Sequence, residues 1–356
     1  MLRIGYHDTS SDERMNGITR YLINIISSSN GKDLHFVNCA PKEFMKSSIL
    51  SRVYKAINVL LGLNIRSSGI NVYWGPAHRL PLFRMKNISY VLTVHDLVWK
   101  ICPDTMSLTG RLMERLFYSS AIKNADIIIA VSDNTAKDLV KYFPKYSHKV
   151  RIIPLANSLN KSARTKYSPK CVNKYILYVG TIEPRKNDEN ILLAYSSLSD
   201  ATKKHYKLIL VGRMGWGGIN IKRLIAKNNL TNHAEYHHYD NDQQLMDLYK
   251  NAYCLLFPSF YEGFGLPILE AHNFGIPVIT SNLSSMPEIL GEGGLLVNPY
   301  STESIQKSIE LMINNPELRN SLSEKAKINS KKFSWEKTIQ KTHQSFIDSI
   351  DVNIRN

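Results

Sequence analysis

Cysteine is scarce in this sequence, and long apolar runs are missing. The four cysteines among the 356 residues, Cys39, Cys102, Cys171 and Cys254, lie at least 63 residues apart. That spacing excludes a disulfide scaffold and the paired cysteines of a metal or redox motif, and it favours a reducing compartment. No apolar run approaches the ~18 residues needed to span a bilayer. Residues 1–6 predict a strand rather than a secretion signal, so we expect the protein to stay in the cytoplasm.

Acidic residues are also few relative to basic ones, 30 against 45, which leaves a net charge of +15. Residues 1–156 hold 21 basic and 11 acidic side chains, residues 157–174 hold five basic and none acidic, and residues 175–356 hold 19 of each. This imbalance indicates that the first half meets an anionic partner: nucleic acid, an anionic membrane surface or a phosphate-bearing substrate. A solvated basic surface without a partner is the alternative.

Short apolar runs alternate with amphipathic helical patterns along most of the chain, which predicts an α/β fold with parallel sheets and helices on both faces. Right-handed crossovers then give doubly wound domains. The predicted strands are residues 3–6, 34–37, 72–74, 90–94, 127–131, 150–153, 175–179, 207–211, 234–237, 254–257 and 277–280. The predicted helices are residues 17–28, 43–61, 107–123, 133–142, 190–199, 220–228, 243–250, 266–274 and 334–350.

A polar, basic stretch divides the chain into two similar halves. We expect one domain over residues 1–160, a basic linker over 161–174 and a second domain over 175–335. Residues 336–356 continue as a C-terminal helix that can pack back on the first domain. Because ligands of open α/β sheets bind beyond the carboxyl ends of the strands, two such domains predict a ligand held in a cleft between them.

One motif follows the predicted strand 175–179 and ends where the next helix begins. Arg185 and Lys186 are adjacent there, just before Asn187. A guanidinium, an ammonium and the positive end of a helix dipole together suit a phosphate or diphosphate. A surface turn with ordinary solvated charges is the alternative.

A second motif, residues 259–271, follows the buried strand 254–257. Gly263 and Gly265 let backbone amides approach a ligand closely, and a proline two residues later suits the first turn of a helix. The amides of Phe264, Gly265 and Leu266 are expected to point at an anion.

Two glutamates eight residues apart frame this glycine-rich loop. Glu270 lies on the helix behind the loop, where its carboxylate can accept hydrogen bonds from ribose hydroxyls. Glu262 lies in the loop itself, within reach of a sugar hydroxyl. One capping carboxylate and one solvated carboxylate are the alternative roles.

These motifs resemble those of a known enzyme family. Glu262 and Glu270, with Gly-Phe-Gly-Leu-Pro between them, resemble the E-x7-E signature of retaining GT-B glycosyltransferases of the fourth family. Glu183–Asn187 is similar to the donor-phosphate motif of the family's bacterial polysaccharide mannosyltransferase branch. Further matches lie, in chain order, at residues 16–21, 93–97, 131–135, 211–212 and 242–248. The resemblance covers about residues 3–335 and implies two Rossmann-like domains facing across a cleft, the first for the acceptor and the second for the nucleotide sugar.

The resemblance also implies a role for each matching residue. Arg185 and Lys186 bind the donor diphosphate and stabilise it as it leaves, while Glu262 and the loop amides hold the sugar. The implied catalytic set is His95, Arg185, Lys186 and Glu262, and the implied donor-binding set is Gly17, Arg185, Lys186, Glu262, Phe264, Gly265, Leu266 and Glu270.

Two of these residues lie in the first half of the chain. Gly17 lets the backbone close near the diphosphate, and His95 lies against the transferred sugar, where it either hydrogen-bonds a hydroxyl or supports positive charge. A plain strand-end turn is the alternative for His95 and Asp96. Residues 154–157 lack the glycine that the family often has there, so the geometry of the hinge is left open.

No metal or other cofactor is expected. Fixed cations stabilise a leaving diphosphate without a metal. His233, His237 and His238 look like a metal cluster, but two of them are adjacent on a predicted strand and face opposite ways, so we interpret them as structural. A leaving phosphate oxygen can take the acceptor's proton, and the resemblance implies retention at the transferred sugar.

We expect GDP-mannose as the donor and a polyprenyl-diphosphate-linked saccharide as the acceptor, as in O-antigen assembly, which makes the enzyme a hexosyltransferase at the inner face of the cytoplasmic membrane. Residues 44–61 predict an apolar helix flanked by Lys46, Arg52 and Lys55, which suits an anionic leaflet. A helix packed on the sheet is the equal alternative.

Three other functions compete with this one. A glycosyltransferase of the same fold that uses a UDP-sugar fits the same motifs, and so does a GT-B epimerase or phosphorylase, because fold alone does not settle function. A basic nucleic-acid-binding protein explains the charge but not the glycine-rich loop, and the aromatic and basic interleaving of RNA-binding motifs is missing.

Overall fold

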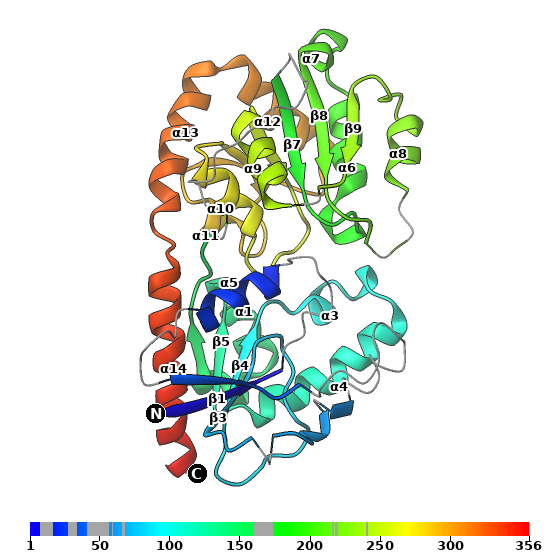
Figure 1. Ribbon diagram of the computed structural model, residues 1–356. Helices are drawn as coiled ribbons and strands as arrows, with labels where there is room; N and C mark the ends of the chain where they lie inside the picture. Colours follow the sequence, from blue (N-terminus) through cyan, green and yellow to red (C-terminus); the bar gives the residue numbers. More distant parts are fainter. Residues whose placement is uncertain are drawn as a thin grey trace. The chain divides into compact units, whose positions relative to one another are not determined.

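The structure is a computed structural model that describes residues 1–7, 17–27, 34–40, 57–58, 60–65, 68–157, 159, 174–215, 217, 220–239 and 241–355. The chain divides into two compact units (Figure 1). We call them the N-terminal unit, which comprises Met1–Lys100, Leu108–Leu155 and Trp335–Asn356, and the C-terminal unit, which comprises Ile101–Ser107 and Ala156–Ser334. Residues 161–173 of the predicted linker lie outside the described residues, and Lys174 already belongs to a strand.

The N-terminal unit contains a six-stranded sheet in the order β2-β1-β3-β4-β5-β6. All neighbouring strands in it are parallel. The strands are β1 (Leu2–Tyr6), β2 (Leu34–Asn38), β3 (Val72–Gly75), β4 (Ser89–Val94), β5 (Ile127–Ala130) and β6 (Val150–Ile152). β3, β4 and β5 are buried along their whole length, as expected for the middle of a sheet that is covered on both faces.

The helices that accompany this sheet come from both ends of the chain. They are α1 (Gly17–Ser27), α3 (Val98–Ile101), α4 (Leu108–Asn124), α5 (Asp133–Tyr142), the 3₁₀ helix η2 (Pro144–Lys149) and α14 (Trp335–Arg355), while η1 (Pro103–Thr105) falls in the C-terminal unit. Ser132 caps α5, because its side-chain oxygen accepts a hydrogen bond from the backbone N–H of Thr135.

α14 completes the core of the N-terminal unit. Its buried Phe346 contacts Trp74 of β3 and Phe36 of β2, with ring centroids 5.5 and 6.1 Å apart. The hydroxyl of Thr338 donates to the carbonyl oxygen of Pro154 at 2.7 Å. A segment from the end of the chain therefore covers a sheet that is built from its beginning.

The C-terminal unit repeats the parallel pattern with the order β12-β11-β10-β7-β8-β9. Its strands are β7 (Lys174–Val179), β8 (Tyr206–Val211), β9 (Ala234–His237), β10 (Cys254–Phe257), β11 (Val278–Ser281) and β12 (Gly294–Val297). Its helices are η3 (Pro184–Lys186), α6 (Asp188–Ser196), α7 (Asp200–His205), α8 (Ile221–Lys227), α9 (Asp242–Asn251), α10 (Leu266–Asn273), α11 (Met286–Leu290), α12 (Thr302–Asn314) and α13 (Pro316–Ser330).

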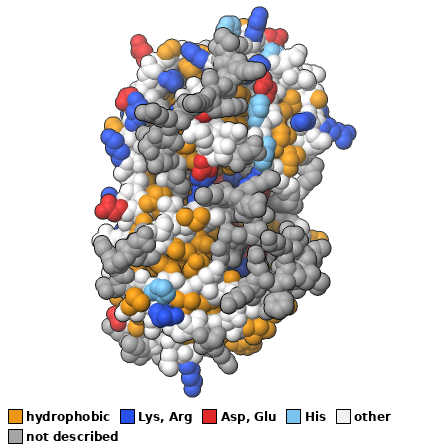
Figure 2. Space-filling model, viewed as in Figure 1, with side chains coloured by type: hydrophobic (Ala, Val, Ile, Leu, Met, Phe, Trp, Pro, Cys, Tyr) orange, Lys and Arg blue, Asp and Glu red, His pale blue; other side chains and the backbone are white. Residues whose placement is uncertain are grey.

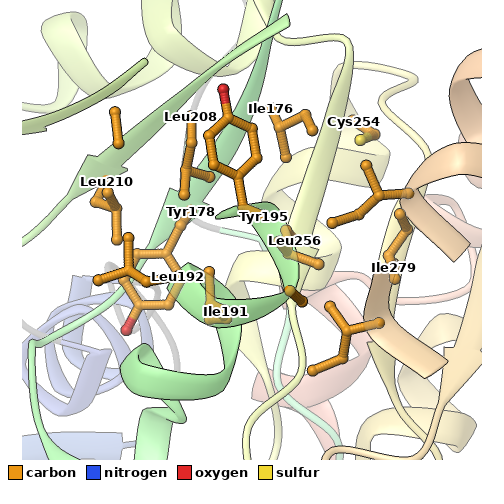
Figure 3. Close-up of a cluster of buried hydrophobic side chains, with 14 of the residues drawn as sticks. Ile176, Tyr178, Ile191, Leu192, Tyr195, Leu208, Leu210, Cys254, Leu256 and Ile279 are labelled. Atoms are coloured by element: carbon orange, nitrogen blue, oxygen red, sulfur yellow. The ribbon is translucent and has the colours of Figure 1, made fainter. Parts of the chain in front are cut away.

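Alternate side chains of these strands enter two different layers. Ile176, Tyr178 and Leu256 join one buried cluster together with α6, α8 and α12, and part of it is drawn in Figure 3. On the other face, the hydroxyl of Tyr175 donates to the carbonyl oxygen of Leu248 in α9 at 2.6 Å. Helices on both faces of a parallel sheet confirm the predicted doubly wound architecture.

The boundaries of most predicted elements agree with the structure within one or two residues, and β9, β10 and α5 agree at both ends. The sequence reading missed β12 as well as α3, α7 and α11, and it set no bounds for α12 and α13. Most of the predicted helix 44–61 lies outside the described residues.

Candidate functional site

The two sequence motifs lie at the same edge of the C-terminal sheet. β7 and β10 are neighbouring parallel strands, so the loops that follow them emerge side by side. The backbone N–H of Phe260 in the second loop donates to the carbonyl oxygen of Arg185 in the first at 3.0 Å. The two loops form one site, which we call the paired-loop site.

Two cations of the first loop hold one carboxylate of the second. Lys186 Nζ lies 2.6 Å from Glu262 Oε1, and Arg185 Nη1 lies 2.8 Å from Glu262 Oε2. Arg185 also donates to the carbonyl oxygen of Tyr261 at 2.7 Å and forms an ion pair with Glu183 at 2.6 Å. The guanidinium is therefore fixed in the fork geometry that suits carboxylate or phosphate oxygens.

Burial and charge act in opposite directions on this cluster. Burial by itself raises the pKa of Glu262, but Arg185 and Lys186 outweigh it and lower that pKa to about 2. Burial lowers the pKa of Lys186, and the carboxylate of Glu262 opposes that shift. Each buried ion is kept charged by its partner, so removing one partner leaves an uncompensated buried charge.

The backbone of the first loop is held by two side chains at its end. Asn187 adopts a left-handed conformation with φ of 68°, and its amide nitrogen donates to the carbonyl oxygens of Pro258 and Pro299 at 2.9 and 2.8 Å. Asp188 accepts from the backbone N–H of Glu183 at 3.0 Å, and burial raises its pKa to about 7. These contacts fix the turn that presents Arg185 and Lys186.

Two serines position the backbone of the second loop. Ser285 Oγ lies 2.9 Å from the carbonyl oxygens of both Glu262 and Phe264, and the backbone N–H of Glu262 donates to Ser284 Oγ at 3.0 Å. Gly265, with φ of 100°, turns the chain into α10, a conformation that disfavours any residue with a Cβ.

Glu270 lies in the first turns of α10 and is buried. The hydroxyl of Tyr249, on α9, donates to Glu270 Oε2 at 2.7 Å. This bond holds the side chain in one orientation. An acceptor oxygen at that position suits a hydroxyl-bearing ligand such as ribose.

His95 and Gly17 belong to the N-terminal unit. Gly17 begins α1, and His95 directly follows β4. The His95 Nε2 atom lies 2.8 Å from the carbonyl oxygen of Pro76, so Nε2 carries the proton, and its ring meets Tyr21 edge-on at 5.3 Å. Burial lowers the pKa of His95 to about 4. The ring is therefore neutral at neutral pH, which favours hydrogen bonding over support of positive charge.

The structure thus brings most predicted site residues together in the C-terminal unit: Arg185, Lys186, Glu262, Phe264, Gly265, Leu266 and Glu270. Sequence reasoning missed several residues that position them, namely Glu183, Asn187, Tyr249, Ser284 and Ser285. Glu183 and Asn187 are the ends of the first motif. Nothing in the sequence pointed to Tyr249, Ser284 or Ser285.

The histidines of the second half make local contacts. His237 Nε2 lies 3.0 Å from Glu235 Oε2, and His238 Nδ1 lies 3.3 Å from the carbonyl oxygen of Gly212. Across the part of the chain that the structure describes, no group of three histidine, cysteine, aspartate or glutamate side chains is placed to hold a metal ion.

Family comparisons match both units. A model described as "Glycosyltransferase Family 4" matches residues 65–157, and one described as "Glycosyl transferases group 1" matches residues 161–329. Over 286 residues the chain is 32% identical to the O-antigen chain mannosyltransferase B of Escherichia coli. The matched region covers 77% of this chain and 74% of that protein. The chain belongs to glycosyltransferase family 4. The predicted glycosyltransferase family and transferase activity are thereby confirmed.

Two further comparisons, one of sequence and one of structure, agree with this assignment. It is 31% identical to the O-antigen chain mannosyltransferase RfbU of Salmonella typhimurium over 234 residues, 65% of this chain and 62% of RfbU. Sucrose-phosphate synthase of Thermosynechococcus elongatus superimposes with a TM-score of 0.76 at 18% identity, covering 98% of the glycosyltransferase and 99% of the synthase. The predicted GT-B fold is confirmed. Among its described helices, the glycosyltransferase has none long and apolar enough to cross a membrane.

Proposed function

We propose that the protein is a retaining α-mannosyltransferase that moves mannose from GDP-mannose to a lipid-diphosphate-linked saccharide in O-antigen assembly. The observation that carries the proposal is the paired-loop site, in which Arg185 and Lys186 are held by Glu262. The names of the two relatives, an O-antigen chain mannosyltransferase in each case, support the sugar and the pathway.

The charges of the paired-loop site indicate how a donor enters. Arg185 and Lys186 are balanced by Glu183 and Glu262, so the cluster as a whole is neutral and does not attract a diphosphate by net charge. We infer an exchange: diphosphate oxygens replace the carboxylate of Glu262 at one or both cations. Glu262 is then free to accept hydrogen bonds from hydroxyls of the sugar.

The same cations act as the glycosidic bond breaks. Negative charge develops on the leaving diphosphate, and donors fixed in advance stabilise that charge more in the transition state than in the ground state. A phosphate oxygen of the leaving group takes the proton of the acceptor hydroxyl, which attacks from the same face of the sugar. Retention follows from that geometry, and no metal is assigned a role.

His95 and Glu270 have separate tasks in this proposal. His95 donates through Nε2 to Pro76, so its Nδ1 is the ring atom that can accept a hydrogen bond from a sugar hydroxyl. Glu270, held by Tyr249, accepts from the ribose hydroxyls of the nucleotide. We infer that the guanine base binds near Gly212 and Tyr239, and Gly17 keeps its proposed role at the diphosphate.

A ligand-protection experiment tests the donor. GDP should raise the melting temperature more than UDP or ADP does, because a ligand that binds only the native state stabilises it. Glu270→Ala should remove the GDP shift, whereas His95→Ala should keep the shift and reduce transfer from GDP-mannose. A larger shift with UDP would contradict the mannose assignment and favour a UDP-sugar donor. Loss of the GDP shift in His95→Ala would mean that the nucleotide binds at a different position from the one proposed.

The acceptor assignment places the enzyme at an anionic membrane surface, peripherally on the inner face of the cytoplasmic membrane. The net charge of +15, all of it carried by residues 1–174, supports this location. Transfer of radiolabelled mannose to an extracted lipid fraction, compared with release of free mannose, tests the acceptor. Free mannose alone would contradict a lipid-linked acceptor.

A further inference from the structure

The first half of α4 carries apolar side chains on the side that faces solvent. Leu108, Leu112, Met113 and Leu116 are 83%, 58%, 49% and 58% exposed. Single exposed apolar residues are common on soluble proteins, and Figure 2 shows hydrophobic side chains at the surface among scattered lysines and arginines. Four such residues within nine positions of one helix are a continuous surface.

The spacing places these residues on one side of the helix. Leu108, Leu112 and Leu116 recur every four residues, so they line one face, and Met113 borders it. The opposite face is the one that packs: Tyr118 is buried, and Glu114 pairs with Arg79 and His78 at 3.3 and 3.4 Å. This helix therefore turns apolar groups outward where a helix of a globular protein is normally polar.

The charges on the outward face have a single sign. Arg111 and Arg115 lie beside the leucines and are exposed. The one acidic residue of α4, Glu114, is on the inward face. An apolar stripe bordered by arginines matches the boundary between acyl chains and anionic headgroups, whereas a protein partner for this face would need a matching acidic rim.

A second group of exposed apolar side chains lies beside the other end of α4. Leu63 and Phe83 are 55% and 70% exposed. The segment that carries Phe83 is held to the end of α4, because the amide nitrogen of Asn124 donates to the carbonyl oxygens of Pro81 and Leu82, both at 2.9 Å. The same segment reaches Leu60 through the backbone N–H of Leu82 at 2.8 Å.

We propose that the outer face of α4, formed by Leu108, Arg111, Leu112, Met113, Arg115 and Leu116, lies on the anionic leaflet of a membrane. The leucines enter the headgroup boundary, and the arginines bind lipid phosphates. This surface deepens the proposed function, since a lipid-linked acceptor stays at the bilayer and the enzyme must reach it there. It differs from the predicted helix 44–61, most of which lies outside the described residues.

Flotation of the whole protein with vesicles tests the surface. Wild type should bind vesicles of phosphatidylcholine with phosphatidylglycerol and bind poorly to phosphatidylcholine alone. Arg111→Gln with Arg115→Gln should weaken binding to the anionic vesicles roughly twenty- to thirtyfold, because each cation near an anionic surface changes affinity about fivefold. Leu112→Ser with Leu116→Ser should weaken it about a hundredfold or more, because two apolar side chains no longer leave water.

A matched control comes from another exposed apolar residue. Ile328 of α13 is 63% exposed and belongs to the C-terminal unit, so Ile328→Ser should leave flotation unchanged. Equal flotation of the α4 variants and wild type would overturn the proposal. So would a change of oligomeric state in the leucine variant with unchanged flotation, since the face would then contact a second copy.

The GDP-induced melting shift separates this proposal from the proposed function. None of the substituted residues lies in the paired-loop site, so each α4 variant should keep the wild-type shift, which also shows that it is folded. If wild type itself showed no GDP shift, the donor assignment would fail, while the flotation series would still decide whether α4 is the membrane surface.

Discussion

The carboxyl edges of the two sheets use polar groups in different ways. In the C-terminal unit, Arg185, Lys186 and Glu262 hold one another as buried ions across two loops. In the N-terminal unit, two histidines at this edge are neutral: His95 bonds a carbonyl, His7 Nδ1 lies 2.6 Å from the hydroxyl of Tyr73, and burial lowers the pKa of each to about 4. The same strand–loop–helix architecture therefore carries a buried ion cluster at one edge and neutral imidazoles at the other.

The largest expected loss of stability comes from removing the carboxylate of Glu262 at the charged edge. Glu262→Ala leaves Arg185 and Lys186 without their shared carboxylate, and an uncompensated buried charge of this kind costs about 3–5 kcal/mol. Urea unfolding should show this loss as a lower midpoint. Glu303→Ala is the matched control, because Glu303 forms its ion pair with Lys307 in full exposure and its removal should change nothing measurable. Equal midpoints for the two variants would show that the buried cluster stabilises no more than a surface pair.

Lys186→Ala tests whether the charged edge stabilises the leaving diphosphate, as proposed. Removing one fixed donor at a developing negative charge typically lowers kcat about 100- to 1000-fold. Single-turnover transfer from GDP-mannose measures this, with circular dichroism to show that the fold persists. Near-normal transfer by the folded variant would refute the role of Lys186.

Acid should reduce the stability contributions of the two edges in different pH ranges. The folded state disfavours protonation of His95, whose pKa falls from 6.5 to about 4, so its stability contribution is complete above pH 6.5 and declines as pH falls towards 4. The pKa of Glu262 falls from 4.5 to about 2, so its contribution declines only between those values. Unfolding free energies should be measured at several pH values. For His95→Gln they should depend less on pH than those of wild type between pH 6.5 and about 4. For Glu262→Gln they should depend less on pH between pH 4.5 and about 2. The reverse pattern would contradict the neutral and charged states assigned here.

The smallest effect is expected at Tyr249. Tyr249→Phe removes the hydrogen bond to Glu270 and keeps the ring, which stacks on Phe274. A bond of this kind contributes about 0.5–1.5 kcal/mol, so KM for the donor should rise roughly two- to tenfold with little change in kcat. Tyr195→Phe, in the same unit, removes a hydroxyl that bonds the backbone carbonyls of Tyr206 and His233 and should leave KM unchanged. A fall in kcat without a change in KM would argue against a role in positioning Glu270.

Local patterns predicted the elements well because most strands are short apolar runs that end at a turn. β12 escaped notice because Gly294–Val297 is brief and its burial is incomplete, so its alternation is weak. The site was predictable where a motif is contiguous, as in Glu183–Asn187. Tyr249, Ser284 and Ser285 act on residues 21 to 23 positions away, and only the folded sheet brings such partners together.

The placement of α14 has a consequence for synthesis of the protein on the ribosome. Domains generally fold from the N-terminus as the chain emerges, but the N-terminal unit needs Phe346 against Trp74 and Phe36, and Thr338 against Pro154. The C-terminal unit has all of its strands before that helix is translated. The unit that is made first is therefore finished last, and until translation reaches residues 335–355 the aromatic face of its sheet is exposed to chaperones and proteases.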